Sequence, residues 1–431
     1  MGDRPNVFLL VLDTVRRDRA YDDRRDVMPT LRRFAAGATT FTDAVAPASW
    51  SVPAHASLFT GCHPGTHGAT TVRPVFRAEP TLPGLLSAAG YETYAVSPNQ
   101  YVRPETGFAR GFDEFETLSP ALPPRLAALL APAVNRFMYS PARYPPERLL
   151  NAVRARRGTT TELPSPPDSG LVDRVTELVR GASSPFFLFV NLFDAHLPRS
   201  PAPEHVDRFV DDDLADAPVV RDERAHKFGP GMEERGLARL RQLYDADLRT
   251  VDDRLGLLLD RLSATGVLDD ALVVVLSDHG EHLGEFGLVG HQHSVFEPVV
   301  AVPLVVSFPA GGPDTVTGQV ETRRVFHTVL DETGVREYPS TSLAGGHSDG
   351  VTRGAFYSPM LDVEALTWHD TARYDRDLLG EPLSFARTGA HKLVRFDGRE
   401  WLFSLPETRG ESLPRDRGQT PFDRLSGPPT G

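Results

Sequence analysis

NVFLLVLD, residues 6–13, is an apolar run that stops abruptly at a carboxylate. A second run of this kind, LVVVLSDHGE at residues 272–281, ends in Asp278 and His279. Uninterrupted apolar runs of this length are typical of parallel strands that are buried on both faces. Open α/β sheets bind their ligands at the carboxyl edge, where both runs end. The two runs therefore predict that Asp13, Asp278 and His279 meet at one edge of a sheet and bind a divalent metal ion.

The rest of the chain alternates apolar runs with amphipathic segments. This pattern predicts an α/β fold, an α/β/α sandwich with a mainly parallel central sheet and helices on both faces. We expect strands near residues 6–12, 91–97, 186–193, 271–276 and 302–308, and helices near 29–37, 53–60, 80–89, 171–180 and 236–264. The last helix should cover one face of the sheet, and we interpret Asp245, Asp247, Asp252 and Asp253 as its solvated face.

The pattern changes along the chain, which predicts a main domain over residues 1–335 and a small antiparallel subdomain with a frayed tail over 336–431. In the second region, short apolar segments surround turn signals such as Asp397-Gly398. Residues 118–170 have Pro-rich ends around a stretch of Ala, Leu and Arg, which predicts an insertion over the edge of the sheet that carries the site.

The composition excludes several classes of protein. A formal charge of -12 argues against a broad nucleic-acid-binding surface. Lys227 and Lys392 are the only lysines, and with the acidic excess this leads to the hypothesis of a high-salt or high-GC source. The single cysteine, Cys62, excludes an intramolecular disulfide. Because no leader and no membrane-spanning apolar stretch are visible, we expect a cytoplasmic protein without integral membrane contact.

The segment SVPAHASLFTG, residues 51–61, lies between the two Asp-bearing runs. Pro53 suits the first turn of a helix and Gly61 suits its exit. A hydroxyl at the start of this helix would face unpaired amide groups and the positive end of the helix dipole, where a tetrahedral oxyanion binds well. Ser51 is therefore a candidate nucleophile, and a simple helix cap is the alternative.

Together these segments resemble the sulfatase family within the alkaline phosphatase superfamily. The resemblance covers roughly residues 5–310 and rests on the order and spacing of many pieces. Besides the three segments quoted above, it includes GFD at 111–113, the stretch 185–196, and the stretch that runs from Gly290 to VPLV at 302–305. It implies an alkaline phosphatase-like fold and a metal-dependent hydrolase of sulfate or phosphate esters.

The resemblance also implies roles for the residues at the predicted sheet edge. Asp13, Asp278 and His279 would ligate one divalent cation, normally calcium or magnesium in sulfatases, and the imidazole makes manganese or zinc an alternative. Ser51 would be the nucleophile, with its pKa lowered by the metal.

Three histidines complete the predicted site. The resemblance implies that His196 and His291 contact the oxyanion or the leaving group of the substrate. His55, four residues after Ser51, is interpreted either as the catalytic partner of Ser51 or as a residue on the helix surface.

The sequence departs from the sulfatase pattern at three positions. Thr14 stands where many sulfatases carry a second metal-binding Asp, so that ligand is either lost or replaced, and the nearby Asp18 is the candidate replacement. Asn99 falls near a substrate motif that contains Lys in many relatives. Sulfatases make a formylglycine from Cys, or less often from Ser, in a Cys/Ser-x-Pro-x-Arg motif. Here that motif begins with Ser51 and has His55 in place of Arg, so we favour an unmodified serine and keep formylglycine as the alternative.

We therefore expect a metal-dependent hydrolase of sulfate esters, or of phosphate esters, that forms a covalent intermediate on Ser51 or on its formylglycine. Two alternatives remain open. One is a phospho- or sulfo-group transferase that acts on a glycan or a lipid head group. The other is a non-catalytic relative that binds an anion or a glycan. The expected partner is a small-molecule or glycan ester, and the sequence leaves the oligomeric state open.

Overall fold

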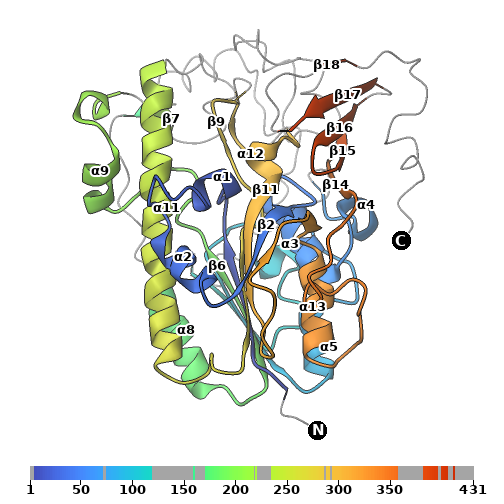
Figure 1. Cartoon of the computed structure of the whole chain (residues 1–431). Coiled ribbons are helices and arrows are strands. Elements are labelled where there is room, and N and C mark those ends of the chain that lie inside the picture. Colours follow the sequence, from blue (N-terminus) through green and yellow to red (C-terminus); the bar gives the residue numbers. More distant parts are fainter. Residues whose placement is uncertain are drawn as a thin grey trace.

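The computed structural model describes residues 4–70, 74–118, 159–160, 170–217, 219–220, 234–285, 288–291, 294–357, 382–396, 399–405 and 411–412. Within these ranges the chain forms a central sheet between two layers of helices, with a smaller sheet beside it (Figure 1). Most of the expected insertion at 118–170 lies outside the described residues, as does the expected C-terminal tail. The domain boundary at residue 335 stays a prediction.

The central sheet is mixed and mainly parallel. Its strands are β1 (Val7–Leu12), β2 (Thr39–Val45), β3 (Glu92–Ser97), β4 (Glu114–Thr117), β6 (Phe186–Leu192), β8 (Leu272–Leu276), β11 (Ala301–Ser307), β12 (Thr315–Val316) and β13 (Val320–Glu321). Their order is β12-β2-β11-β8-β1-β6-β3-β4, with β13 also paired to β2. The central strand β1 is parallel to both β6 and β8, whereas β11 is antiparallel to β8 and β2. The expected architecture is confirmed.

Helices cover both faces of this sheet (Figure 1). One layer contains α2 (Pro29–Ala35), α8 (Leu171–Gly181) and α11 (Glu234–Ser263), and the other contains α3 (Ser51–Thr60), α5 (Leu82–Ala88) and α13 (Arg324–Glu332). The alternation of side chains along β1 explains this arrangement. Phe8 and Leu10 enter the core beneath α11, whereas Leu9 and Val11 enter the core beneath α3. The strand is therefore buried on both faces, as its apolar run indicates.

Shorter elements connect these layers. They are α1 (Arg17–Ala20), α4 (Pro64–His67), α9 (Pro203–Phe209), α12 (Glu297–Val300), the 3-10 turns η1 (Pro104–Thr106) and η3 (Asp212–Leu214), and two pairs of short strands, β5 (Thr159–Thr160) with β7 (Val219–Val220) and β9 (His282–Leu283) with β10 (Val289–Gly290). No helix in the described part of the chain is long and apolar enough to cross a membrane.

A second sheet follows the main one in sequence and is wholly antiparallel. It consists of β14 (Thr352–Phe356), β15 (Leu383–Arg387), β16 (His391–Phe396), β17 (Arg399–Ser404) and β18 (Glu411–Ser412), paired in that order. Phe396 lies opposite Arg399, so β16 and β17 form the hairpin that Asp397-Gly398 predicts. Arg387 of β15 joins the two sheets, because its guanidinium donates to Asp43 of β2 and to Glu297 of α12.

The interpretation of the α11 aspartates as a solvated face is wrong for three of the four. Asp245 pairs with Arg19 and Arg25, Asp247 is fully buried, and Asp252 accepts hydrogen bonds from the backbone N–H groups of residues 30 and 31 at 2.7 and 2.9 Å. These carboxylates anchor α11 to loops at the carboxyl edge of the sheet and to α2. Their partners lie far away in sequence, so helical periodicity does not identify them.

Candidate active site

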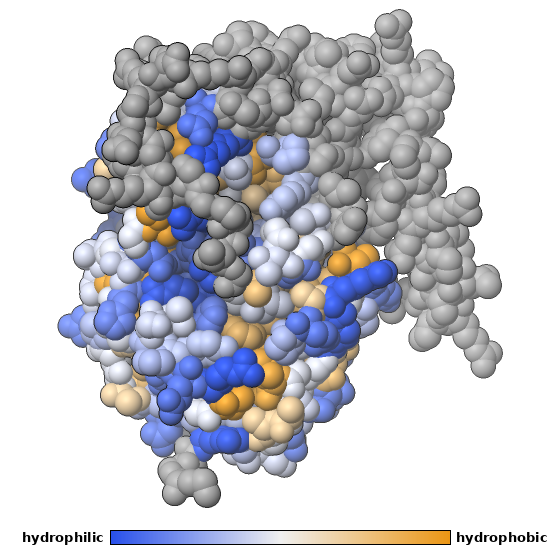
Figure 2. All heavy atoms as spheres, turned by 90° about the vertical axis from the view of Figure 1, so that its right-hand side faces the viewer, coloured by the Kyte–Doolittle hydropathy of each residue, from blue (hydrophilic) through white to orange (hydrophobic). Residues whose placement is uncertain are grey.

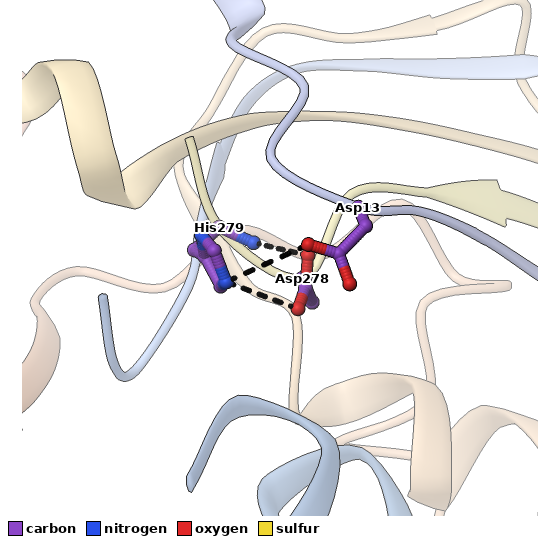
Figure 3. Close-up of side chains that lie close together, drawn as sticks. All are labelled: Asp13, Asp278 and His279. Carbon is purple, nitrogen blue, oxygen red and sulfur yellow. Dashed lines mark hydrogen bonds and ion pairs between the residues drawn. The ribbon is translucent and has the colours of Figure 1, made fainter. Parts of the chain in front are cut away.

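The two Asp-bearing runs end side by side, because β1 and β8 are adjacent parallel strands in register. Asp13 follows β1, and Asp278 and His279 follow β8. One ligand atom from each lies within 4.8 Å of the others, and all three residues are fully buried (Figure 3). Nε2 of His279 is 3.3 Å from Oδ2 of Asp278 and 3.9 Å from Oδ1 of Asp13. The predicted constellation is thus present at the predicted edge.

The electrostatics of this group fit a divalent cation. Burial and the neighbouring Asp13 carboxylate raise the pKa of Asp278 well above its usual value. Burial and the nearby His291 lower the pKa of His279 well below its usual value, so this imidazole is neutral and offers no compensating charge. Oδ2 of Asp278 accepts no hydrogen bond from the described residues. Two hard carboxylates and one neutral imidazole nitrogen form a donor set for Mg²⁺, Ca²⁺, Mn²⁺ or Zn²⁺.

Ser51 is the first residue of α3, and Trp50 occupies the N-cap position that the sequence assigned to the serine. The Ser51 hydroxyl oxygen is 3.3 Å from Nε2 of His279 and 3.2 Å from the amide nitrogen of Asn99. The residue is 2% exposed and lies at the positive end of the helix dipole. Ser51 therefore faces the group of Asp13, Asp278 and His279, and Gly61 ends the helix in the left-handed conformation, as expected.

Asn99, in the loop after β3, connects Ser51 with the carboxylates. Its amide nitrogen also donates to Oδ2 of Asp13 at 2.8 Å. Its amide oxygen accepts from the backbone N–H of Tyr101 at 2.8 Å, which fixes the orientation of the amide so that the nitrogen points into the site. Asn191 of β6 makes a longer contact with the same Asp13 oxygen, at 3.4 Å.

His55 does not contact the hydroxyl of Ser51. Its Nδ1 is 2.9 Å from the Ser51 carbonyl oxygen and 3.4 Å from Oδ2 of Asp278, and its Nε2 is 3.1 Å from the amide nitrogen of Asn191. This pattern requires an Nδ1–H donor and an Nε2 acceptor, hence a neutral ring. Burial lowers the pKa of His55 to about 4, in agreement with that assignment. The residue is fully buried against Phe189, so the helix-surface interpretation is wrong.

His196 and His291 lie together on one side of the group of Asp13, Asp278 and His279. The ring of His291 is 4.3 Å from that of His279 and 5.1 Å from that of His196, measured between centroids. Nδ1 of His291 is 3.3 Å from Oε1 of the fully buried Glu281. Nδ1 of His196 is 2.5 Å from the carbonyl oxygen of Leu197. The structure therefore brings both histidines to the edge where the sequence placed them.

Glu281 belongs to a buried ionic network that reaches the long helix α11. The guanidinium of Arg199 pairs with Glu281, and its other end is 3.2 Å from Oδ2 of Asp247 on α11. Arg199 also lies over the ring of Tyr244, 4.8 Å from its centroid. The Tyr244 hydroxyl donates to the carbonyl of Thr14 at 2.7 Å. The network thus ties the loops after β1, β6 and β8 to the long helix.

Thr14 does not replace a metal-binding carboxylate. Its hydroxyl donates to the carbonyl of Ala195 at 2.8 Å, and its backbone is in the left-handed region with φ of 61°. Asp18, the expected substitute, forms an ion pair with Arg16 at 2.7 Å and is not part of the Asp13, Asp278 and His279 group. Of the two alternatives, the described residues therefore favour loss of this ligand over its replacement by Asp18.

Sequence reasoning missed the contacts made by Asn99, Asn191 and Arg199. A usable signal existed for Asn191, which is the one polar residue in FFLFVNL, a strand buried at every position. A buried amide in such a strand must find hydrogen-bond partners, and here these are His55 and Asp13. Asn99 and Arg199 lie in loops without a comparable pattern.

The fold is an α/β fold of the alkaline phosphatase-like type, and its buried Asp13, Asp278 and His279 form a candidate divalent-cation site. Residues 5–335 match the sulfatase family, and the chain belongs to that family. A choline-sulfatase of Rhizobium meliloti is 30% identical over 161 residues, which are 37% of this chain and 30% of that protein. An arylsulfatase of Clostridium perfringens is 22% identical, with 93% of this chain and 88% of that protein covered.

A solved structure shows the same fold. The phosphonate monoester hydrolase of Agrobacterium radiobacter superposes with a TM-score of 0.71 at 20% sequence identity. The superposition covers 94% of this chain and 91% of the hydrolase. The alkaline phosphatase-like architecture expected from the sequence is thus confirmed.

Proposed function

We propose that this protein is a metal-dependent hydrolase of sulfate esters, with unmodified Ser51 as the nucleophile and Asp13, Asp278 and His279 as metal ligands. The position of the Ser51 hydroxyl carries the proposal. It starts a buried helix, lies 3.3 Å from Nε2 of His279 and 3.2 Å from the amide of Asn99, and faces two carboxylates that need a cation. Membership of the sulfatase family supports the same reaction.

A divalent cation bound by these residues would supply Lewis-acid charge to the nucleophile and to the transferred group. The chain's own groups would do the rest. Asn99 holds the Ser51 hydroxyl in place, and the first turn of α3 offers backbone amides and a positive dipole to the oxyanion. His55 donates from Nδ1 to the carbonyl of Ser51 and lies 3.4 Å from Oδ2 of Asp278, which makes it a positioning residue for the start of α3 in this proposal.

The proposed reaction has two displacement steps. The Ser51 hydroxyl first gives its proton to water, and its oxygen then bonds to sulfur while the bond from sulfur to the substrate alcohol breaks; the departing oxygen takes a proton from His196 or His291. Water then attacks the sulfur of the serine ester and gives a proton to the histidine that was deprotonated in the first step; the Ser51 oxygen leaves, regains a proton from water, and sulfate is released.

Hydrolysis of phosphate or phosphonate esters is the second candidate. The similarity in fold to a phosphonate monoester hydrolase and the imidazole in the ligand set motivate it. An unmodified serine suits it equally, because a serine oxygen attacks phosphorus by the same two steps. A formylglycine at position 51 would instead favour the sulfate reaction, since its hydrate can expel sulfate by re-forming the aldehyde.

The test compares turnover of nitrophenyl sulfate, nitrophenyl phosphate and phenyl phosphonate esters with Mg²⁺, Ca²⁺, Mn²⁺ or Zn²⁺. We expect metal-dependent turnover, with sulfate preferred, that Ser51→Ala abolishes. Ser57→Ala is the matched control, because Ser57 is a buried serine of the same helix whose hydroxyl contacts His67 instead. Turnover that survives Ser51→Ala would refute the nucleophile, and no turnover of any ester with metal present would refute the hydrolase.

Peptide mass spectrometry across residue 51, in protein from its native host, decides the chemical form of the nucleophile. We expect the mass of an unmodified serine. A mass lower by two hydrogens would show formylglycine and would overturn this part of the proposal.

A further inference from the structure

A pocket separate from the active-site group lies between the turn of α4 and one face of the C-terminal antiparallel sheet. Its volume is about 240 Å³. Figure 2 looks onto the side of the molecule on which α4, α13 and this sheet lie, and small hydrophobic groups are set among hydrophilic ones on its described surface. The proposed ester hydrolysis makes no use of this pocket.

Strand pairing explains how the sheet forms a hollow. Two neighbouring rows of side chains line the pocket on this face, Arg353–Ala386–Leu393 and Ala355–Ser384–Arg395, each running across β14, β15 and β16. Opposed residues on one face of an antiparallel sheet are direct neighbours. The small side chains at the centre leave an open floor, and the two arginines lie at its opposite corners.

The charge in this pocket is only partly neutralised. Arg395 pairs with Glu400 at 2.5 Å, and its side chain is 42% exposed. The guanidinium of Arg353 makes no hydrogen bond or ion pair with the described residues, although the backbone N–H of Arg353 donates to Glu321. A guanidinium with unused donors favours a bidentate oxyanion such as carboxylate or sulfate.

The remaining walls suit a sugar ring. Tyr357 continues the β14 row, and its hydroxyl lies so close to α4 that a Cβ at Gly65 would be 2.5 Å from it. Its aromatic ring offers an amphipathic surface, and Ser384 and Thr66 add hydroxyl groups to the lining. The volume is below that of typical drug-sized sites, so one small ring with its substituents is the matching occupant.

The pocket adjoins the segment that carries the nucleophile. The backbone N–H of Ala355 donates to the carbonyl of Pro47 at 2.9 Å, and Pro47 lies four residues before Ser51. Four residues span at most about 14 Å, so an oligosaccharide a few units long covers the separation. We infer that this pocket is an accessory subsite that binds a carboxylate- or sulfate-bearing sugar of the same glycan whose ester lies at Ser51. This inference rests on the proposed hydrolysis for the identity of the ligand.

Binding to the full-length Ser51→Ala protein tests the subsite without turnover. The probe is a chondroitin 6-sulfate tetrasaccharide, which alternates carboxylates with sulfates, and neutral chitotetraose serves as the uncharged comparison. We expect Arg353→Met to raise the tetrasaccharide Kd at least tenfold. Ala386→Tyr, which fills the floor, should do the same. Arg336→Met removes an exposed arginine after α13, outside the pocket lining, and should leave the Kd unchanged.

The outcomes separate the subsite from the reaction. The subsite is refuted if the Arg353→Met and Ala386→Tyr variants bind the tetrasaccharide as tightly as the Ser51→Ala parent. It is also refuted if this parent does not bind the tetrasaccharide. A separate turnover assay uses the Arg353→Met variant that keeps Ser51. Its turnover of nitrophenyl sulfate should match that of the wild type, because this small ester does not reach the pocket. Loss of that turnover would overturn the assignment of Arg353 to a separate subsite, whereas inactive wild-type protein would refute the proposed hydrolysis alone.

Discussion

The amide nitrogen of Asn99 donates to Oδ2 of Asp13 at 2.8 Å, and the same nitrogen lies 3.2 Å from the Ser51 hydroxyl oxygen. One side chain thus fixes both a proposed metal ligand and the proposed nucleophile. We expect Asn99→Ala to lower kcat/KM about 10- to 100-fold, because a hydrogen bond to a charged group contributes about 1.5–3 kcal/mol. The measurement is steady-state turnover of nitrophenyl sulfate at saturating metal.

The adjacent, exposed Gln100 provides the control for this prediction, and Gln100→Ala should retain full activity. Wild-type activity in Asn99→Ala would show that Ser51 and Asp13 keep their geometry without the amide, and would contradict the role argued for it.

Removal of the metal should lower the stability of the wild type much more than that of Asp278→Asn. Without a cation, the two carboxylates are buried away from water and repel each other. Burial and the charge of Asp13 both raise the pKa of Asp278 for these reasons. In a chelator at pH 8 we therefore expect the Tm of Asp278→Asn to equal or exceed that of the wild type. With millimolar Mg²⁺ or Mn²⁺ the Tm of the wild type should rise by several degrees and that of the variant much less. A ligand raises the Tm only of a protein whose native state binds it, and the variant has lost one of the proposed metal ligands.

Differential scanning calorimetry with and without metal gives this comparison independently of turnover. Asp173→Asn, which removes an exposed carboxylate of α8, is the control and should respond to metal like the wild type. An equal gain of Tm in Asp278→Asn and wild type would place the cation elsewhere.

The sequence predicted the sheet edge because the relevant signals are local. Asp13 directly follows β1, and Asp278 lies two residues after the end of β8. Because both runs end at the same edge of the sheet, the pattern alone placed Asp13 near Asp278. The contacts of Asn99 could not be found in this way, since its partner Asp13 is 86 residues away and no periodicity links a loop to a strand end. The prediction that the α11 aspartates are solvated was wrong for the same reason. Helical spacing indicates which face of the helix a residue occupies, but not whether arginines distant in sequence cover that face.

Glu281 should affect catalysis through His291. Its carboxylate lies between Nδ1 of His291, at 3.3 Å, and the guanidinium of Arg199, so it fixes the orientation of the imidazole. We expect Glu281→Gln to lower kcat at least tenfold with a small change in KM. The loss should be larger for an alkyl sulfate than for nitrophenyl sulfate, because a poor leaving group depends more on protonation.

Kinetics with the two esters decide between catalytic positioning and general stability. An equal loss for both esters, or a loss confined to KM, would show that His291 does not act on the leaving group through Glu281. Glu285→Gln is the matched control: Glu285 contacts Arg16 and lies outside the His291 pair, so the ratio of the two rates should stay at the wild-type value.

The contact between the two sheets should weaken in acid because of Glu297. Burial opposes ionisation of Glu297, but Lys392 and Arg387 outweigh it and lower its pKa from 4.5 to about 2. A carboxyl group whose pKa is lower in the folded state than in the unfolded state stabilises the fold. This contribution is fully present at pH values above the unfolded-state pKa, and it is lost as the pH falls from 4.5 towards 2. We expect Glu297→Gln to cost about 3–5 kcal/mol at pH 7, because it leaves buried cations without their partner. The difference from wild type should shrink steadily below pH 4.5.

Urea unfolding at pH 7, 4, 3 and 2, followed by tryptophan fluorescence, measures this effect, since Trp401 is a buried residue of the C-terminal sheet. Glu400→Gln is the control: its pair with Arg395 has both side chains 42% exposed, and exposed pairs contribute little. If Glu297→Gln unfolds at the wild-type urea concentration at pH 7, the buried cluster does not hold the sheets together. A penalty that stays constant from pH 7 to 2 would instead mean that the charge of Glu297 is not the cause, because the wild-type carboxylate takes up its proton within that range.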